Sequence, residues 1–321
     1  MADLRIVVTC PPMLRTSDEW LGSLTDRGIE VELPPVTQHV SRADLERLLP
    51  QCDAIIAGDE PLDRALLEKA VPRLRVISRW GVGIDNVDLE AARELGIEVR
   101  NTPAVFANEV ADVAIGYMLM LARHLHEIDA GVRGGSWPKP QGVSMAGRTL
   151  GVIGLGAIGR AVARRGLAME MTVVGIDPTP AAEAAAVEMG CHLVGLDEVF
   201  EQADVVSLNL PMSPSNRHLV NAERLGRMKP GSFLVNTARG PLVDEEALLA
   251  ALRSGRIAGA ALDVFEEEPL PATSPLRELP NVILGSHNAS NTAEAVSRVN
   301  RMAIDNALAV LAEALAGSAG S

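Results

Sequence analysis

A glycine-rich turn between an apolar segment and a helical segment constrains the fold of this chain more than any other feature. Thr149–Ile153 has the apolar character of a buried strand, and the pattern Gly-x-Gly-x-x-Gly follows it. The turn and the start of the helix comprise Gly154, Gly156, Ala157, Ile158 and Gly159. In such a unit the glycines allow a tight turn, close approach of the backbone to a pyrophosphate, and close packing of helix on strand. The first amides of the helix then bind the anion.

A second apolar segment strengthens this interpretation. Thr172–Ile176 ends in Asp177, which lies 18 positions after Gly159. An acidic residue about 20 positions on is the expected acceptor for the ribose hydroxyls of a dinucleotide. No Arg or Lys lies in the Pro-Thr-Pro segment after Asp177, so a 2′-phosphate would meet a carboxylate and no cation. The sequence therefore predicts a dinucleotide site that binds NAD rather than NADP.

Length and charge limit the other possibilities. A chain of 321 residues suits two domains. Its net charge of −13 argues against nucleic acid or an anionic membrane as a partner, but permits a small anionic substrate held by one or two Arg residues. The three scattered cysteines, and an N-terminus that opens directly on a strand, favour a reducing, cytoplasmic location. No His/Cys cluster has zinc spacing, so no metal is predicted.

The first hundred residues alternate between strand and helix patterns. The predicted strands are Leu4–Cys10, Val31–Leu33, Ala54–Gly58, Leu74–Trp80 and Ile97–Asn101. Ser41 and Asp88 are predicted to cap helices between them. Alternating units of this kind imply a parallel sheet with helices on both faces, of flavodoxin-like type.

A long helical pattern separates this region from the glycine motif. It extends from about Asn108 to Arg133, and it could bridge two domains, form a subunit interface or be a core helix. The loop after it contains Trp137, which could pack on a partner subunit. Beyond the glycine motif, the predicted elements are strands Asp204–Asn209, Ser232–Asn236, Ile257–Asp263 and Val282–Ser286 and a final helix from Thr292 to Leu315.

Polar residues at the carboxyl ends of the strands are the candidates for chemistry, because ligands of open parallel sheets bind there. They are Arg79 with Gly81-Val82-Gly83, Asn209, Thr237 with Arg239, Asp263 with Glu268, and Ser286 with His287. His287 differs from the other five histidines in directly following an apolar strand. Each of these residues by itself has an ordinary structural explanation.

The combination is more specific. The segments GVIGLGAIGR, LVNTARGPLVDEEALLAAL, GAALDVFEEEP and GSHNAS, in that order, resemble the D-isomer-specific 2-hydroxyacid dehydrogenases. The resemblance implies an NAD-dependent hydride transfer to or from the C2 atom of a 2-hydroxy acid. It assigns His287 as the acid/base, Glu268 as the residue that orients it and favours its protonated form, and Arg239 as the cation that holds the substrate carboxylate.

The resemblance also implies further contacts and an organisation. Arg79, Val82 and Gly83 join Arg239 and His287 as substrate-binding residues. The cofactor-binding set extends to Asn209, Pro211, Thr237, Ala238 and Asp263. Residues 1–100 and 287–321 are predicted to form a flavodoxin-like substrate domain, and residues 101–286 a doubly wound Rossmann domain for NAD. A homodimer joined through the NAD-binding domains is expected.

The sequence leaves open which acid is the substrate and whether the protein is an enzyme or a regulatory protein. The phosphoglycerate dehydrogenase branch is similar, but Ala57–Glu60 is rich in carboxylates where an Arg-Ser pair would help to hold a phosphate. This favours a small unphosphorylated acid, such as hydroxypyruvate or glyoxylate, at least as much as 3-phosphohydroxypyruvate. Arg79 and Lys139 leave a phosphate site possible in principle. The alternative class is an NAD(H)-responsive regulatory protein of the same fold.

Overall fold

The chain folds into two compact units in a computed structural model that describes residues 4–36 and 39–318. One unit comprises Met1–Val105 with Asn291–Ser321, and the other comprises Phe106–Ser290. These boundaries lie a few residues later than the sequence-based ones at 100 and 286, and His287 lies within the second unit.

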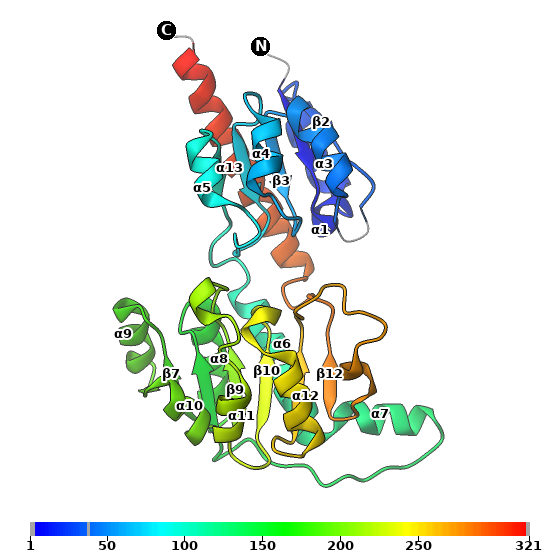
Figure 1. Cartoon of the computed structure of the whole chain (residues 1–321), viewed down its shortest axis with the longest axis vertical. Coiled ribbons are helices and arrows are strands. Elements are labelled where there is room, and N and C mark those ends of the chain that lie inside the picture. Colours follow the sequence, from blue (N-terminus) through cyan, green and yellow to red (C-terminus); the bar gives the residue numbers. More distant parts are fainter. Residues whose placement is uncertain (1–3, 37–38, 319–321) are drawn as a thin grey trace. The chain divides into compact units, whose positions relative to one another are not determined.

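The first unit is built on a five-stranded parallel sheet in the order β2-β1-β3-β4-β5 (Figure 1). Its strands are β1 (Arg5–Val8), β2 (Glu30–Glu32), β3 (Ala54–Ala57), β4 (Val76–Arg79) and β5 (Glu98–Arg100). Its helices are α1 (Pro11–Leu14), α2 (Ser17–Thr25), α3 (Arg42–Leu48), η1 (Leu49–Gln51), α4 (Arg64–Ala70), α5 (Leu89–Glu94) and α13 (Ala293–Ser318). This strand order is that of flavodoxin-like sheets, as predicted.

Local sequence explains where these helices begin. The Ser41 side chain accepts a hydrogen bond from the Asp44 amide at 3.1 Å, and the Asp88 carboxylate accepts one from the Ala91 amide at 2.9 Å. Both are the predicted N-caps, which satisfy amides that the first helical turn leaves without partners. Four of the five observed strands are shorter than the predicted ones, whereas β2 has the predicted length and lies one residue earlier.

Helix α13 returns the chain to the first unit after the whole second unit. It contacts β3, β4 and β5. The Ser78 hydroxyl of β4 donates to the Ala303 carbonyl at 2.8 Å, and the Trp80 indole donates to the Asn300 side chain at 2.7 Å. Both hydrogen bonds are buried, so α13 is an integral layer of this unit.

The second unit contains a seven-stranded parallel sheet in the order β12-β11-β10-β9-β6-β7-β8. Its strands are β6 (Thr149–Ile153), β7 (Thr172–Ile176), β8 (His192–Leu193), β9 (Val205–Leu208), β10 (Phe233–Asn236), β11 (Gly259–Leu262) and β12 (Val282–Leu284). From β6 the sheet grows first toward β8 and then, from β9, in the opposite direction. This is the doubly wound order with its switch point between β6 and β9, and a seventh strand is added at one edge.

Helices cover both faces of this sheet (Figure 1). They are α6 (Ala107–Arg123), α7 (Leu125–Arg133), α8 (Ala157–Ala168), α9 (Pro180–Glu188), α10 (Leu196–Gln202), η2 (Pro214–Asn216), α11 (Ala222–Arg227), η3 (Gly240–Leu242), α12 (Glu245–Arg253) and η4 (Pro275–Glu278). Leu150 and Val152 of β6 pack in the same cluster as α6 and α8, whereas Ile153 joins the cluster of α10, α11 and α12. The alternation of side chains along a strand thus fills two separate cores.

The predicted continuous helix from Asn108 to Arg133 is wrong. His124 adopts a left-handed conformation with φ of 54°, so α6 ends and α7 begins there. Helix α6 buries Val110, Ala114 and Leu121 and is a core helix of its unit, whereas α7 has no buried residue. The apolar periodicity of the sequence continues across His124, but Leu125 is 49% exposed.

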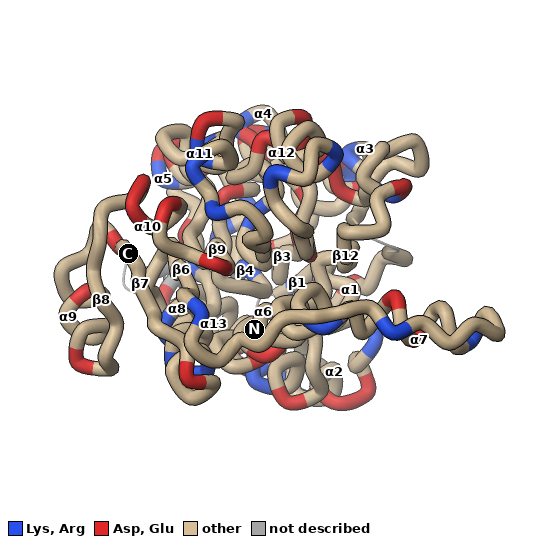
Figure 2. The backbone as a smooth tube through the Cα atoms, turned by 90° about the horizontal axis from the view of Figure 1, so that it is seen from below, with Lys and Arg blue, Asp and Glu red and all other residues tan. Residues whose placement is uncertain are grey.

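Charged residues of both signs are mixed along the described chain (Figure 2). The net charge of −13 is therefore distributed and not concentrated in one segment. Among the helices in the described ranges, none combines the length and the apolar character needed to cross a membrane.

Candidate active site

The glycine turn lies at the switch point of the second sheet, and its three glycines meet three different surroundings. Gly154 has φ of 90°, and a Cβ atom there would lie 2.6 Å from the Asn209 carbonyl oxygen. A Cβ on Gly159 would lie 1.8 Å from the Gly154 oxygen. Neither position has room for a side chain. A Cβ on Gly156 would meet no atom within 4 Å, which leaves an open approach to the backbone. These are the tight turn, the close packing and the ligand approach expected of the motif.

Asp177, at the end of β7, lies directly against this turn. Its Oδ2 atom accepts a hydrogen bond from the Leu155 amide at 2.7 Å, and its Oδ1 atom accepts one from the Thr179 amide at 2.8 Å. Each carboxylate oxygen retains a further lone pair for a ligand hydroxyl.

Arg160 is a residue of this turn that sequence reasoning missed. Its Nη1 atom donates to the Leu155 carbonyl at 2.6 Å, so the first turn of α8 brings a cation back to the glycine turn. The signal was present in the sequence, because Arg160 directly follows Gly159 in the part of the helix that faces the turn.

The neighbouring strand ends contain polar atoms without partners. Asn209 Oδ1, after β9, and Thr237 Oγ1, after β10, are both buried and make no hydrogen bond within the described part of the chain. Pro211 and Ala238 belong to the same two connections. Buried polar groups are normally satisfied, so orphaned atoms at the ligand edge of the sheet indicate partners supplied by a bound molecule.

Arg239 is held in a turn that Asn236 folds back on itself. The fully buried Asn236 side chain donates to the Arg239 carbonyl at 2.9 Å and accepts from the Ala238 amide at 3.0 Å. A Cβ on Gly240 would lie 1.9 Å from the Phe265 carbonyl carbon. The absence of a side chain at Gly240 therefore lets the Arg239 turn pack directly on the backbone that leads to Glu268.

Glu268 and His287 form the central pair of the site. His287 Nδ1 and Glu268 Oε2 are 2.7 Å apart, and Glu268 Oε1 accepts a hydrogen bond from the Phe265 amide at 2.9 Å. Because a carboxylate only accepts, Nδ1 carries a proton, and Nε2 is the nitrogen suited to exchange a proton with a substrate. The His287 side chain is 29% exposed and that of Glu268 is 24% exposed, so a ligand can reach them.

Behind this pair, Asp263 is almost completely buried at 1% exposure. Its carboxylate accepts from the Ala289 amide at 2.8 Å and from the Tyr117 hydroxyl at 3.2 Å. Sequence reasoning identified Asp263 but missed Tyr117, which comes from α6.

In the first unit, Arg79 is 5% exposed and binds groups of its own unit. Its guanidinium pairs with the Asp59 carboxylate and donates to the Ala57 carbonyl and the Asn86 side chain, both at 3.3 Å. The amides of Val82 and Gly83 donate to no acceptor in the described part of the chain. The predicted substrate-binding residues of this unit therefore fall into two groups. The Arg79 side chain is already bonded to residues of its own unit, whereas the amides of Val82 and Gly83 are available to a ligand.

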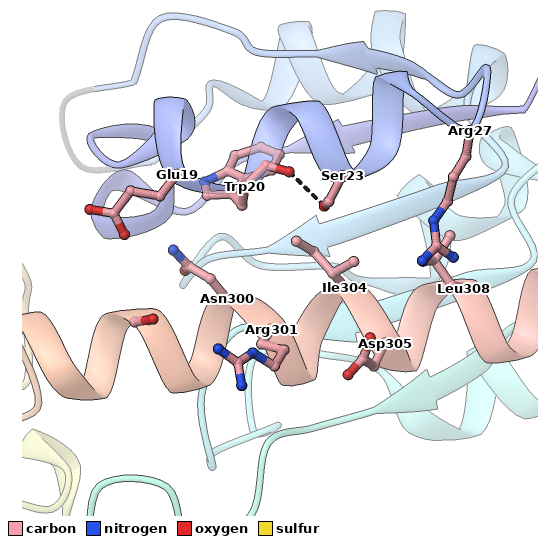
Figure 3. A pocket seen from close by; sticks show the side chains of 10 residues that line it. Glu19, Trp20, Ser23, Arg27, Asn300, Arg301, Ile304, Asp305 and Leu308 are labelled. Carbon is pink, nitrogen blue, oxygen red and sulfur yellow. Dashed lines mark hydrogen bonds between the residues drawn. The ribbon is translucent and has the colours of Figure 1, made fainter.

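A separate cavity of about 230 Å³ lies between α2 and α13 in the first unit (Figure 3). Trp20, Arg27, Asn300 and Arg301 are among the residues that line it, and none of the predicted site residues is among them. It lies in the helical layer and not at the carboxyl ends of the strands, where the fold places ligands.

Comparison with known proteins agrees with this geometry. Residues 115–289 match the family described as D-isomer specific 2-hydroxyacid dehydrogenase, NAD binding domain. A glyoxylate reductase of Thermofilum pendens is 40% identical over 278 residues, which cover 84% of this chain and 82% of the relative. A hydroxypyruvate reductase of Thermotoga maritima is 39% identical over 274 residues, which cover 84% of this chain and 88% of the relative.

Two further similarities extend the comparison. A D-3-phosphoglycerate dehydrogenase of Methanocaldococcus jannaschii is 42% identical over 254 residues, which cover 78% of this chain and 48% of the relative. The crystal structure of D-lactate dehydrogenase from Aquifex aeolicus, complexed with NAD and lactic acid, superposes with a TM-score of 0.84 at 28% identity and covers 99% of this chain and 98% of that one. The chain belongs to the D-isomer-specific 2-hydroxyacid dehydrogenase family and is an NAD-dependent oxidoreductase.

The residues present fit NAD. The open side of Gly156 and the orphaned Asn209 and Thr237 oxygens lie along the ligand edge of one sheet. When bound, NAD supplies the position that gives or takes a hydride; the protein supplies binding, orientation and the proton.

Proposed function

We propose that this enzyme reduces a small, unphosphorylated 2-oxo acid, of the glyoxylate or hydroxypyruvate type, with NADH. The observation that carries the proposal is the His287–Glu268 pair at 2.7 Å; the turn of Arg239 packs through Gly240 on the backbone of Phe265, three residues before Glu268. These three side chains are the acid/base, its orienting carboxylate and the cation that ketone reduction requires.

In the proposed reaction, His287 Nε2 donates a proton to the carbonyl oxygen as negative charge develops there. Glu268 holds the ring by Nδ1 and favours its protonated form. Arg239 binds the substrate carboxylate, and the amides of Val82 and Gly83 are assigned to the same carboxylate. In the reverse direction, Nε2 accepts the proton from the hydroxyl group.

The Arg79 environment supports an unphosphorylated substrate. The Asp59 carboxylate, 48% exposed, offsets the charge of this buried guanidinium. A phosphate placed at these strand ends would meet Asp59 before it met an unneutralised cation, and like charges repel. The names of the glyoxylate and hydroxypyruvate reductases among the relatives support the same substrate class.

For the cofactor, we propose contacts at Gly154, Gly156, Ala157, Ile158 and Gly159, with Asp177 bonded to the ribose hydroxyls and Asp263 to the carboxamide. The strand-end contacts are Asn209, Pro211, Thr237 and Ala238. The three cysteines, all free and buried, support a reducing, cytoplasmic compartment.

A homodimer is also part of the proposal. Helix α7 has no buried residue, and it extends away from the rest of its unit (Figures 1 and 2). Leu125, Val132 and Trp137, on α7 and the loop after it, are 49%, 44% and 76% exposed. Exposed apolar residues that gather on one element without buried residues favour a protein–protein interface, here with a second copy of the NAD-binding unit.

The test is NADH consumption with glyoxylate, hydroxypyruvate, pyruvate and 3-phosphohydroxypyruvate, repeated with NADPH. The proposal expects glyoxylate or hydroxypyruvate to have the highest kcat/KM, and NADH to exceed NADPH. A phosphorylated acid with a far higher kcat/KM would overturn the substrate class. No turnover with any of the acids would favour the regulatory alternative.

A further inference from the structure

The segment that carries His287 is held by one buried residue, Asp263, through both its backbone carbonyl and its carboxylate. The Asp263 carbonyl accepts a hydrogen bond from the His287 amide at 2.7 Å, and its side chain accepts from the Ala289 amide at 2.8 Å. Asp263 therefore binds the backbone at His287 itself and two residues beyond it.

These two hydrogen bonds, which we call the Asp263 bracket, explain the conformation of His287. The residue has φ of 54°, in the left-handed region that non-glycine residues rarely adopt. Such a conformation persists only where the surroundings fix it. The two Asp263 contacts supply that constraint, and they aim the imidazole at Glu268.

Tyr117 completes the bracket from another element. Its hydroxyl donates to Asp263 Oδ1 at 3.2 Å across a sequence separation of 146 residues. A Cβ on Gly285 would lie 2.2 Å from Asp263 Oδ1 and 2.3 Å from the Tyr117 hydroxyl. The Tyr117–Asp263 contact thus occupies the space that Gly285 leaves empty.

The phenol is suited to act as a permanent donor. Burial, the nearby Asp263 charge and the hydrogen bond to it all raise the pKa of Tyr117 above its usual value. The hydroxyl therefore keeps its proton throughout the pH range in which His287 would work.

We propose that Tyr117 is a positioning residue of the reaction: through Asp263 it holds the His287 segment in the conformation that meets Glu268. The inference rests on the proposed role of His287 as the acid/base. Nothing in it requires Tyr117 to contact substrate or cofactor.

The contact itself is testable without any activity. Tyr117 is the single tyrosine of the chain, so the ultraviolet absorbance of tyrosinate reports on it alone. In the native protein, tyrosinate should not form near pH 10, where an unperturbed phenol ionises, and Asp263→Asn should move its formation to lower pH. If Tyr117 of the native wild-type protein ionised near pH 10, the Tyr117–Asp263 contact would not exist in solution and the proposal would fail.

The functional role is tested with Tyr117→Phe, which removes only the hydroxyl. We expect kcat for reduction to fall about fivefold, the equivalent of one hydrogen bond. We also expect the loss of activity at high pH to begin at a lower pH, because a looser Glu268–His287 contact favours the imidazolium less. In a Glu268→Gln background the same change should add no further pH shift.

Ser254→Ala is the control, since it also removes one hydroxyl from the same unit; that hydroxyl bonds the Ala251 carbonyl at 3.1 Å, away from the proposed site. It should leave kcat and the pH profile unchanged. The proposal fails if Tyr117→Phe behaves like this control, or if its pH shift adds fully to that of Glu268→Gln. An active His287→Ala enzyme would instead remove the proposed function, while the tyrosinate titration would still report the bracket.

Discussion

At the scale of single residues, His287 is the group on which the proposed chemistry depends most. Replacing it with Ala removes the proton donor and leaves the glycine turn and Asp177 in place. We therefore expect kcat to fall by roughly 10²–10⁴, while the Kd for NADH, measured by fluorescence titration, stays nearly constant. A near-normal kcat would mean that another group supplies the proton.

Glu268→Gln tests the partner of that histidine. Reduction uses the imidazolium, so activity declines as rising pH removes its proton. An amide at 2.7 Å from Nδ1 favours the imidazolium less than a carboxylate does, so the decline should move to lower pH. The pH dependence of kcat measures this. Glu267→Gln, one residue earlier and exposed, should leave the profile in place.

Asp59 is the residue expected to select against phosphate. Asp59→Asn leaves the charge of Arg79 without its neutralising partner. We expect kcat/KM for 3-phosphohydroxypyruvate to rise about tenfold relative to that for hydroxypyruvate, in line with one charge at short range. Asp26→Asn, an exposed acid of the same unit, should not change this ratio. An unchanged ratio in the Asp59 variant would show that the Arg79–Asp59 ion pair does not determine the preference against a phosphorylated substrate.

At the scale of elements, α7 carries exposed apolar residues of the proposed homodimer interface. Val132→Asp places a charge among its exposed apolar residues and should shift a dimer toward monomer in sedimentation analysis. Val187→Asp makes the same change at another exposed helical position, 52% exposed on α9, and should leave the mass unchanged. If both variants keep the wild-type mass, subunits do not associate through α7.

The same element marks a limit of sequence-based prediction. Helix starts at Ser41 and Asp88 and the glycine turn were predictable, because local side chains and glycines determine them. The break at His124 was not, since a left-handed histidine carries no signal in apolar periodicity. The contacts of Arg79 with Asp59, and of Tyr117 with Asp263, join different elements, so only the fold brings these residues together.

At the scale of the whole molecule, the two units have separate hydrophobic cores, and we therefore predict that the units unfold independently. Cys10 and Cys52 lie in the first unit and Cys191 in the second; all three are buried, and burial raises the pKa of each thiol, that of Cys52 to about 11. We expect slow alkylation of the native protein. NAD should protect Cys191 more than Cys10, because a ligand stabilises the unit that binds it.

Mass spectrometry of the labelled peptides measures this protection, and in denaturant all three thiols should react alike. Rapid labelling of the native protein, or equal protection at Cys10 and Cys191, would contradict the independence of the units.

The return of α13 to the first unit has a consequence for the order in which this protein can be made. The strands of the first unit leave the ribosome before those of the second, yet Ser78 and Trp80 find their partners only at Ala303 and Asn300. The NAD-binding unit is contiguous and can close while synthesis continues. Of the two units, the one whose strands are translated first is therefore completed last, and its strands β3, β4 and β5 have to persist without the helix that packs on them until α13 emerges.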